Sequence, residues 1–275
     1  MATARLLAGG AFALASAALL AAVGLAVRRQ RAPGAAGIAR GRFALWWLAL
    51  AFYTALDGAL DVAVATGPVP TLAIDAWVAA FAVLIVVMFW GLMSYMAFLV
   101  TGRVGALRVI TWVYAAQLVL LIVVAMALEP VGAHASGWGV DLEYAHADFA
   151  AANIVFALAF LLPPLLAAIA YLGLWLRVRD APARRRIAIV GGSIAAWLIV
   201  ALAGAAAAKD ADTLQVGLKT LGVVTAVGPL LAYRPPRFLA TRLPQREHEV
   251  ARDVLTPEQQ SQARAELHKR VHELV

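Results

Sequence analysis

The chain has 275 residues, of which 63% are hydrophobic and only 14% charged, and it contains no cysteine. Soluble domains are close to half apolar, so this composition predicts an integral membrane protein. It also excludes disulfide scaffolds, cysteine nucleophiles, thiolate metal sites and iron–sulfur clusters. The formal net charge of +7 raises the question of whether the basic residues form a face that binds nucleic acid.

Seven runs of apolar residues are long enough to cross a bilayer, which takes about 20 residues in a helix. The runs are apolar on all faces, as helices in lipid are. We therefore predict an all-α integral membrane protein, with a seven-helix bundle over residues 1–237 and a tail over 238–275. The predicted spans are approximately 6–27, 43–66, 73–99, 107–128, 149–176, 187–208 and 214–233.

The first run resembles a secretory signal, because Ala15-Ser16-Ala17 is similar to a cleavage site. Its apolar stretch is too long for the core of a signal. Cleavage would also leave Arg28 and Arg29 on the outer face, against the positive-inside tendency. We expect the first helix to be retained, with the N-terminus outside.

The connections between the spans alternate between basic and acidic along the chain. This alternation predicts an N-out, C-in arrangement in the inner or plasma membrane. The charges separate across a bilayer instead of forming one continuous face, so the expected partners are the bilayer and its anionic inner-leaflet lipids, and no nucleic acid. The basic residues of the predicted inner connections are Arg28, Arg29, Arg31, Arg40 and Arg42; Arg103 and Arg108; Arg177, Arg179, Arg184, Arg185 and Arg186; and Arg234, Arg237 and Arg242. The acidic residues of the predicted outer connections are Asp75, Glu129, Asp141, Glu143, Asp148, Asp210 and Asp212.

Prolines and small residues interrupt some of the spans. Pro163 and Pro164 are expected to kink the fifth helix and Pro229 the seventh. Such kinks either frame a cavity or adjust the shape of the bundle without a ligand. Small residues predict surfaces for close packing between helices. They are Gly191, Gly192, Ala195 and Ala196 in the sixth span and Gly217 and Gly222 in the seventh.

The tail changes composition sharply at about residue 238. Thr256-Pro257-Glu258-Gln259 has the form of a capping box and predicts a cytoplasmic helix over about 257–274. The apolar stripe of this helix is narrow and its charges nearly cancel. It is either a solvated helix or a docking helix for a cytoplasmic protein partner or for self-association.

Three ionisable residues fall inside the predicted spans. Asp57 and Asp61 are one turn apart on the second helix, and Lys219 is on the seventh at a similar depth. Charges at membrane depth are costly and usually face the interior of a bundle. The cluster is either a buried ion pair that fixes helix register or a site that couples to protons or to a ligand.

We expect these three charges to face a cavity bounded by the second, third and seventh helices. Further candidate lining residues are Asp75, Trp77, Tyr95, Gln117 and Gln215. The outer connection over residues 130–148 is rich in His, Asp and Glu, but their spacing matches no metal motif, so we expect a lid or packed cap and no metal site. Catalytic motifs are not found either, so we expect no enzyme and assign no catalytic residue.

Seven helices, an outer N-terminus and a lysine in the last helix together resemble the microbial rhodopsins. Asp75-Ala76-Trp77, near the start of the third predicted helix, is similar to the counter-ion segment of that family. The resemblance implies that Lys219 carries retinal as a Schiff base and that Asp75 is the counter-ion. A looser likeness in topology is to the seven-helix membrane regions of bacterial sensors.

Three functions follow from these observations. The leading hypothesis is a sensor or receptor whose outward-facing polar cavity is read by Asp57, Asp61 and Lys219. The alternatives are a proton-coupled transporter of a small solute or ion, and an opsin-like protein that binds retinal at Lys219. Outside the opsin-like alternative, no cofactor is expected.

Overall fold

The structure is a computed structural model that describes residues 2–30, 34–179, 181–206 and 212–233. Within these ranges, seven helices are long and apolar enough to cross a membrane, which confirms the prediction of a multi-pass helical protein. The predicted tail and its helix over 257–274 lie outside the described residues. The helices are α1 (Ala2–Arg29), α2 (Gly34–Thr66), α3 (Thr71–Thr101), α4 (Val104–Leu128), α5 (Ala150–Arg177), α6 (Ala181–Ala206) and α7 (Asp212–Tyr233).

Several helices are longer than the predicted spans. α2 begins at Gly34 instead of residue 43, so Arg40 and Arg42, which we expected in a basic loop, lie within the helix. α5 continues through Pro163 and Pro164 as one helix. Each predicted span overlaps one of these helices, whereas the helix ends depend on contacts that hydropathy does not report.

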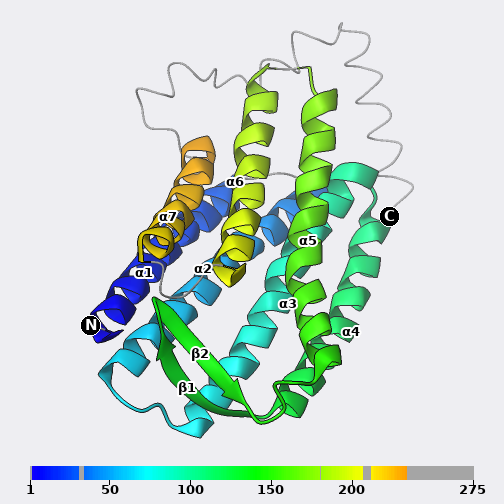
Figure 1. Cartoon of the computed structure of the whole chain (residues 1–275). Helices are drawn as coiled ribbons and strands as arrows, with labels where there is room; N and C mark the ends of the chain where they lie inside the picture. The colour runs from blue at the N-terminus through cyan, green and yellow to red at the C-terminus, as the bar shows by residue number, and fades with distance from the viewer. Residues whose placement is uncertain (1, 31–33, 180, 207–211, 234–275) are drawn as a thin grey trace, which may run out of the picture. The chain divides into compact units, whose positions relative to one another are not determined.

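The helices pack against one another in chain order and close into a ring (Figure 1). α1 packs against α2 on one side and against α7 on the other, and α3 contacts both α4 and α5. α5, α6 and α7 then follow in sequence. Because α1 is the neighbour of both α2 and α7, it separates the two helices that carry the intramembrane charges.

Aromatic and aliphatic side chains fill the interior of the ring. Phe89 of α3 is 1% exposed, and it lies edge-on to Phe160 of α5 and Trp197 of α6, with ring centroids 6.0 and 6.5 Å away. Phe160 and Trp197 are themselves 5.3 Å apart. Burial of large aromatic side chains is a major source of packing energy, and here it joins α3, α5 and α6.

A β-hairpin connects α4 to α5. Its strands, β1 (Pro130–Ser136) and β2 (Gly139–Tyr144), are antiparallel, and Gly137 adopts a φ of 59° in the two-residue turn between them. The hairpin contacts α1, α2 and α3 and lies at the same end of the helices as the N-terminus of α1 (Figure 1). Tyr144 packs against the ends of α4 and α5, and burial raises the pKa of its hydroxyl.

Arg42 joins three helices at the end opposite the hairpin. Its Nη1 donates to Ser94 Oγ of α3 and to the carbonyl oxygen of Leu107 on α4, both at 3.1 Å. The guanidinium also lies 4.7 Å from the ring centroid of Trp90, an arrangement in which cation and ring attract each other. Arg42 is thus a structural clamp and not a loop residue.

Candidate polar cavity

Asp57 and Lys219 line the same cavity, which has a volume of about 270 Å³. Four helices surround it, and its lining residues lie in the middle of those helices or towards the hairpin. They are Phe12, Ala13 and Ser16 of α1; Thr54 and Asp57 of α2; Val200 and Ala201 of α6; and Gln215, Leu218, Lys219 and Gly222 of α7. The cavity therefore combines an acid, a base, an amide and two hydroxyl side chains within an apolar wall.

The opposite charges in this cavity do not form a contact ion pair. Among the described residues, no carboxylate oxygen of Asp57 or Asp61 lies within 4.0 Å of the Lys219 ammonium. Asp57 and Lys219 nevertheless line one cavity, and Asp61 lies one helical turn from Asp57. The three charges predicted from the sequence are thus brought near one another, with space left between Asp57 and Lys219.

Asp61 lies one turn closer to the hairpin than Asp57, and the residue is 2% exposed. Its Oδ2 is buried without a hydrogen-bond partner. A Cβ added at Gly9 of α1 would lie 3.4 Å from this oxygen, so the carboxylate packs directly against the helix backbone. Buried polar atoms normally have partners, which makes this oxygen an unusual feature of the described residues.

The hairpin turn covers Asp61 at the hairpin end of the helices. The carbonyl oxygen of Trp138 approaches α1 so closely that a Cβ at Gly9 would lie only 2.4 Å from it. A Cβ at Gly139 would lie 3.9 Å from Asp61 Oδ1. Gly9 therefore allows the backbone of the turn to sit against α1, with Gly139 next to the carboxylate.

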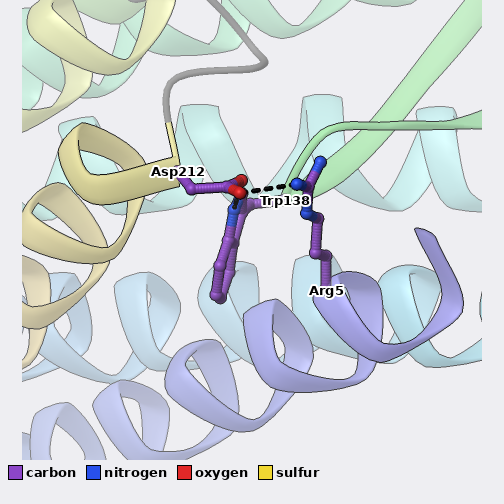
Figure 2. A network of polar contacts seen from close by, with 3 residues as sticks. All are labelled: Arg5, Trp138 and Asp212. Atoms are coloured by element: carbon purple, nitrogen blue, oxygen red, sulfur yellow. Dashed lines mark hydrogen bonds and ion pairs between the residues drawn. The ribbon is translucent and has the colours of Figure 1, made fainter. Parts of the chain in front are cut away.

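Three polar side chains, Arg5, Trp138 and Asp212, connect this turn to the ends of α1 and α7, as Figure 2 shows. We call this cluster the latch. Trp138 Nε1 donates a hydrogen bond of 3.0 Å to Asp212 Oδ1 at the start of α7. Arg5 of α1 binds the other oxygen, Oδ2, of the same carboxylate. The side chains of Arg5 and Asp212 are 29% and 49% exposed, so solvent partly screens this ion pair.

The other predicted lining residues lie apart from this cavity, with the exception of Gln215. Asp75 is exposed and lines a separate cavity with Glu129 and Pro130. Trp77 Nε1 donates to the carbonyl oxygen of Leu56 at 3.2 Å.

Tyr95 stacks on Phe43 with their centroids 4.2 Å apart, and Gln117 is half-buried on α4, which does not line the cavity. The cavity is thus bounded by α1, α2, α6 and α7 and not, as we expected, by the second, third and seventh helices. The physical reason is that α7 closes the ring against α1.

Asp75 and Lys219, which the resemblance to microbial rhodopsins pairs, line different cavities. Under that resemblance Asp75 would face Lys219 as its counter-ion. In the structure Lys219 shares its cavity with Asp57, while Asp75 lines the cavity between α3 and α4. Asp57, and not Asp75, is therefore the carboxylate that shares a cavity with Lys219.

Sequence reasoning did not identify Arg5, Trp138 or Asp212 as interacting residues. Each is an unremarkable outer residue in the sequence, and they are brought together only by the fold. Ser16 was missed for a similar reason, because nothing marked α1 as a wall of the cavity. The one available signal was the acidic character of Asp212 beside the basic Arg5 on the predicted outer side.

Two histidines in or just after the hairpin lie close to acidic side chains. His134 Nδ1 lies 3.0 Å from Glu143 Oε1, and His146 Nε2 lies 3.7 Å from Glu129 Oε2. These pairs are more than half exposed and contribute little to stability. Within the described part of the chain, no three His, Asp or Glu side chains gather in a way that could hold a metal ion.

Comparison of the chain with protein-family models, with curated proteins and with solved structures finds no match. Function is therefore inferred from the geometry of the cavity and its cover.

Proposed function

We propose that this protein is a multi-pass cell-membrane receptor that senses a small zwitterionic solute in the cavity between α1, α2, α6 and α7. One observation carries the proposal: Asp57 and Lys219 line the same cavity but do not form a contact ion pair. Charges at membrane depth are costly. If these two only neutralised each other, direct contact would be the most favourable arrangement.

The separation of the two charges leaves each of them able to pair with a ligand. Lys219 is suited to a ligand carboxylate, Asp57 to a ligand ammonium, and Gln215 can donate and accept hydrogen bonds. The volume of about 270 Å³ lies just below the usual range for drug-sized ligands, about 300–1,000 Å³. The site is therefore suited to a solute of amino-acid size.

The charge distribution supports an outward-facing site. By the positive-inside tendency, the basic connections favour an inner position for the end opposite the hairpin, so the hairpin and the cavity beneath it would face outwards. Ligand binding would then be reported through the helices to the basic inner end or to the tail, where a cytoplasmic partner could respond.

Ligand-induced thermal stabilisation tests the receptor proposal. The purified protein in lipid nanodiscs is heated with a panel of free amino acids and betaine, using acetate and methylammonium as single-charge controls. A ligand that binds the folded state raises the unfolding temperature with its concentration. We expect at least one zwitterion to do so, and neither single-charge control.

Substitutions then locate the site. Asp57→Asn and Lys219→Gln should each remove the stabilisation, because each leaves one ligand charge without a partner. Asp75→Asn, at an exposed carboxylate in a different cavity, should retain it. A panel without any stabilising zwitterion, or a stabilisation that survives both cavity variants, would contradict the proposal.

A second candidate, a proton-coupled carrier, is favoured by the carboxyl group of Asp61. Its Oδ2 is buried without a partner, one helical turn from Asp57, and a carboxyl in that position can take up and release a proton between the cover and the cavity. In proteoliposomes a carrier should show solute flux that depends on a pH gradient and is abolished by Asp61→Asn. Flux that is absent, or unchanged in Asp61→Asn, would eliminate this candidate.

A further inference from the structure

α5 and α6 enclose an apolar groove of about 470 Å³, separate from the polar cavity. It extends towards the end of these helices that lies away from the hairpin. Gly191 and Gly192 form part of its wall, and they differ in their surroundings. A Cβ at Gly191 would lie 2.6 Å from Tyr171 Cβ, whereas a Cβ at Gly192 would meet nothing within 4 Å. Gly191 thus packs the two helices together, and Gly192 leaves the groove open.

The positively charged side chain of Arg184 lies at one end of this groove. Trp175 lines the groove, and the guanidinium of Arg184 lies over its ring, 4.8 Å from the centroid. Arg177 and Arg185 are also exposed at this end. A guanidinium stacked on an aromatic face keeps its N–H groups at the edge, where they can donate to phosphate oxygens.

We propose that this groove binds one anionic phospholipid, with an acyl chain between α5 and α6 and the phosphate at Arg184. Charge complementarity selects this occupant, because an apolar groove that ends in exposed arginines matches a molecule with an apolar chain and an anionic head. The same arginines lie on the side predicted to face the anionic inner leaflet. This site is independent of the proposed receptor function, since it shares no residue with the polar cavity.

Fluorescence quenching by brominated lipids tests the proposal on the full chain. The protein is reconstituted into phosphatidylcholine vesicles that contain increasing fractions of brominated phosphatidylglycerol or, in parallel, brominated phosphatidylcholine. The contribution of Trp175 is the difference between each protein and the same protein carrying Trp175→Phe. The ratio of the two lipids' apparent affinities for Trp175 is the quantity measured.

We expect brominated phosphatidylglycerol to bind beside Trp175 about fivefold more tightly than brominated phosphatidylcholine, the effect of one basic residue near an anionic lipid. Arg184→Gln and Gly192→Leu should reduce this ratio to near one, the first by removing the cation and the second by filling the groove. Arg184→Lys should keep most of it. The matched controls Arg108→Gln and Gly173→Leu lie outside the groove, and a Cβ at Gly173 meets nothing within 4 Å.

Equal quenching by the two lipids in the wild-type chain would overturn the proposal, because Trp175 would then contact only non-selective lipid. A preference that survives Arg184→Gln would do the same, since this variant removes the cation at an exposed side chain. If Gly192→Leu changed the oligomeric state while the two lipids quenched equally, the groove would be an interface between copies of the chain and the lipid assignment would be wrong.

Discussion

The indole Nε1 of Trp138 donates a hydrogen bond of 3.0 Å to Asp212 Oδ1, and this bond ties the turn of the hairpin to the first residue of α7. Arg5 holds the other oxygen of the same carboxylate, so Asp212 joins three segments that are far apart in the sequence (Figure 2). The turn covers Asp61, and α7 carries Lys219. The latch therefore connects the hairpin turn, which covers Asp61, with α7, which lines the cavity.

Breaking the latch should make the cavity more accessible from the outer side. Because the chain has no cysteine, Ser16→Cys introduces a single thiol into the cavity lining. We expect Trp138→Phe to increase the rate at which this thiol reacts with a water-soluble methanethiosulfonate, by about tenfold, since a hydrogen bond to a charged acceptor contributes about 1.5–3 kcal/mol. Trp112→Phe, at a side chain that is 77% exposed, is the matched control. An unchanged rate in Trp138→Phe would show that the latch does not limit access.

The orientation of the chain can be tested with two matched glycines. Gly67 lies between α2 and α3 at the hairpin end and Gly105 lies at the start of α4 at the opposite end, and a Cβ at either would meet nothing within 4 Å. In intact cells we expect Gly67→Cys to react with a membrane-impermeant maleimide and Gly105→Cys to react only after permeabilisation, since the basic end should be inside. The reverse pattern would invert the topology and place the cavity on the inner side.

The sequence allowed the seven spans to be predicted because long apolar runs are a strong signal for helices in lipid. The start of α2 could not be predicted in the same way. Arg40 and Arg42 look like loop residues, yet Arg42 is accommodated in the helix because Ser94 and the Leu107 carbonyl of other helices accept its hydrogen bonds. The hairpin was expected only as a cap, since its strands are short and their alternation is weak.

The candidate site was predictable in part. Charges at membrane depth are rare enough for Asp57 and Lys219 to stand out from sequence alone, and the structure places both at one cavity. The helices that surround Asp57 and Lys219 are determined by close contacts between helix backbones, and the sequence indicates these contacts less clearly. A Cβ at Gly10 would lie 2.9 Å from the Gly58 carbonyl oxygen, so α1 and α2 cross closely here, whereas the predicted packing glycine Gly222 has nothing within 4 Å.

The close approach of the hairpin turn to α1 makes Gly9 intolerant of any side chain. A Cβ there would lie 2.4 Å from the Trp138 carbonyl oxygen, which is backbone and cannot rotate away. We expect Gly9→Ala to destabilise the folded protein by about 1–3 kcal/mol, as overpacking does, and to lower the unfolding temperature in detergent. Gly41→Ala is the matched control, because its Cβ meets nothing within 4 Å and alanine favours a helix more than glycine does. Equal unfolding temperatures for the two variants would contradict the contact between the turn and α1.

The clamp formed by Arg42 should contribute to stability through its two acceptors. Arg42→Met keeps much of the apolar stem but leaves Ser94 Oγ and the Leu107 carbonyl oxygen without this donor. Leaving a buried polar group such as the Ser94 hydroxyl without its partner costs about 1–3 kcal/mol, whereas the Leu107 carbonyl oxygen keeps Thr111 Oγ1 as a donor. We therefore expect a fall in the unfolding temperature that comes mainly from Ser94.

Arg42→Lys should recover only part of this stability, because an ammonium lacks the planar fork and stacks less well on Trp90. Arg108→Met, at an exposed arginine near the same end, should leave the unfolding temperature nearly unchanged. If Arg42→Met and Arg108→Met had the same effect on the unfolding temperature, Arg42 would contribute only to the surface charge of the end opposite the hairpin. The packing of α2 against α3 would then depend on Gly91, where a Cβ would lie 2.5 Å from the Arg42 carbonyl oxygen. The comparison of the two arginines therefore separates a clamp between helices from a general basic surface.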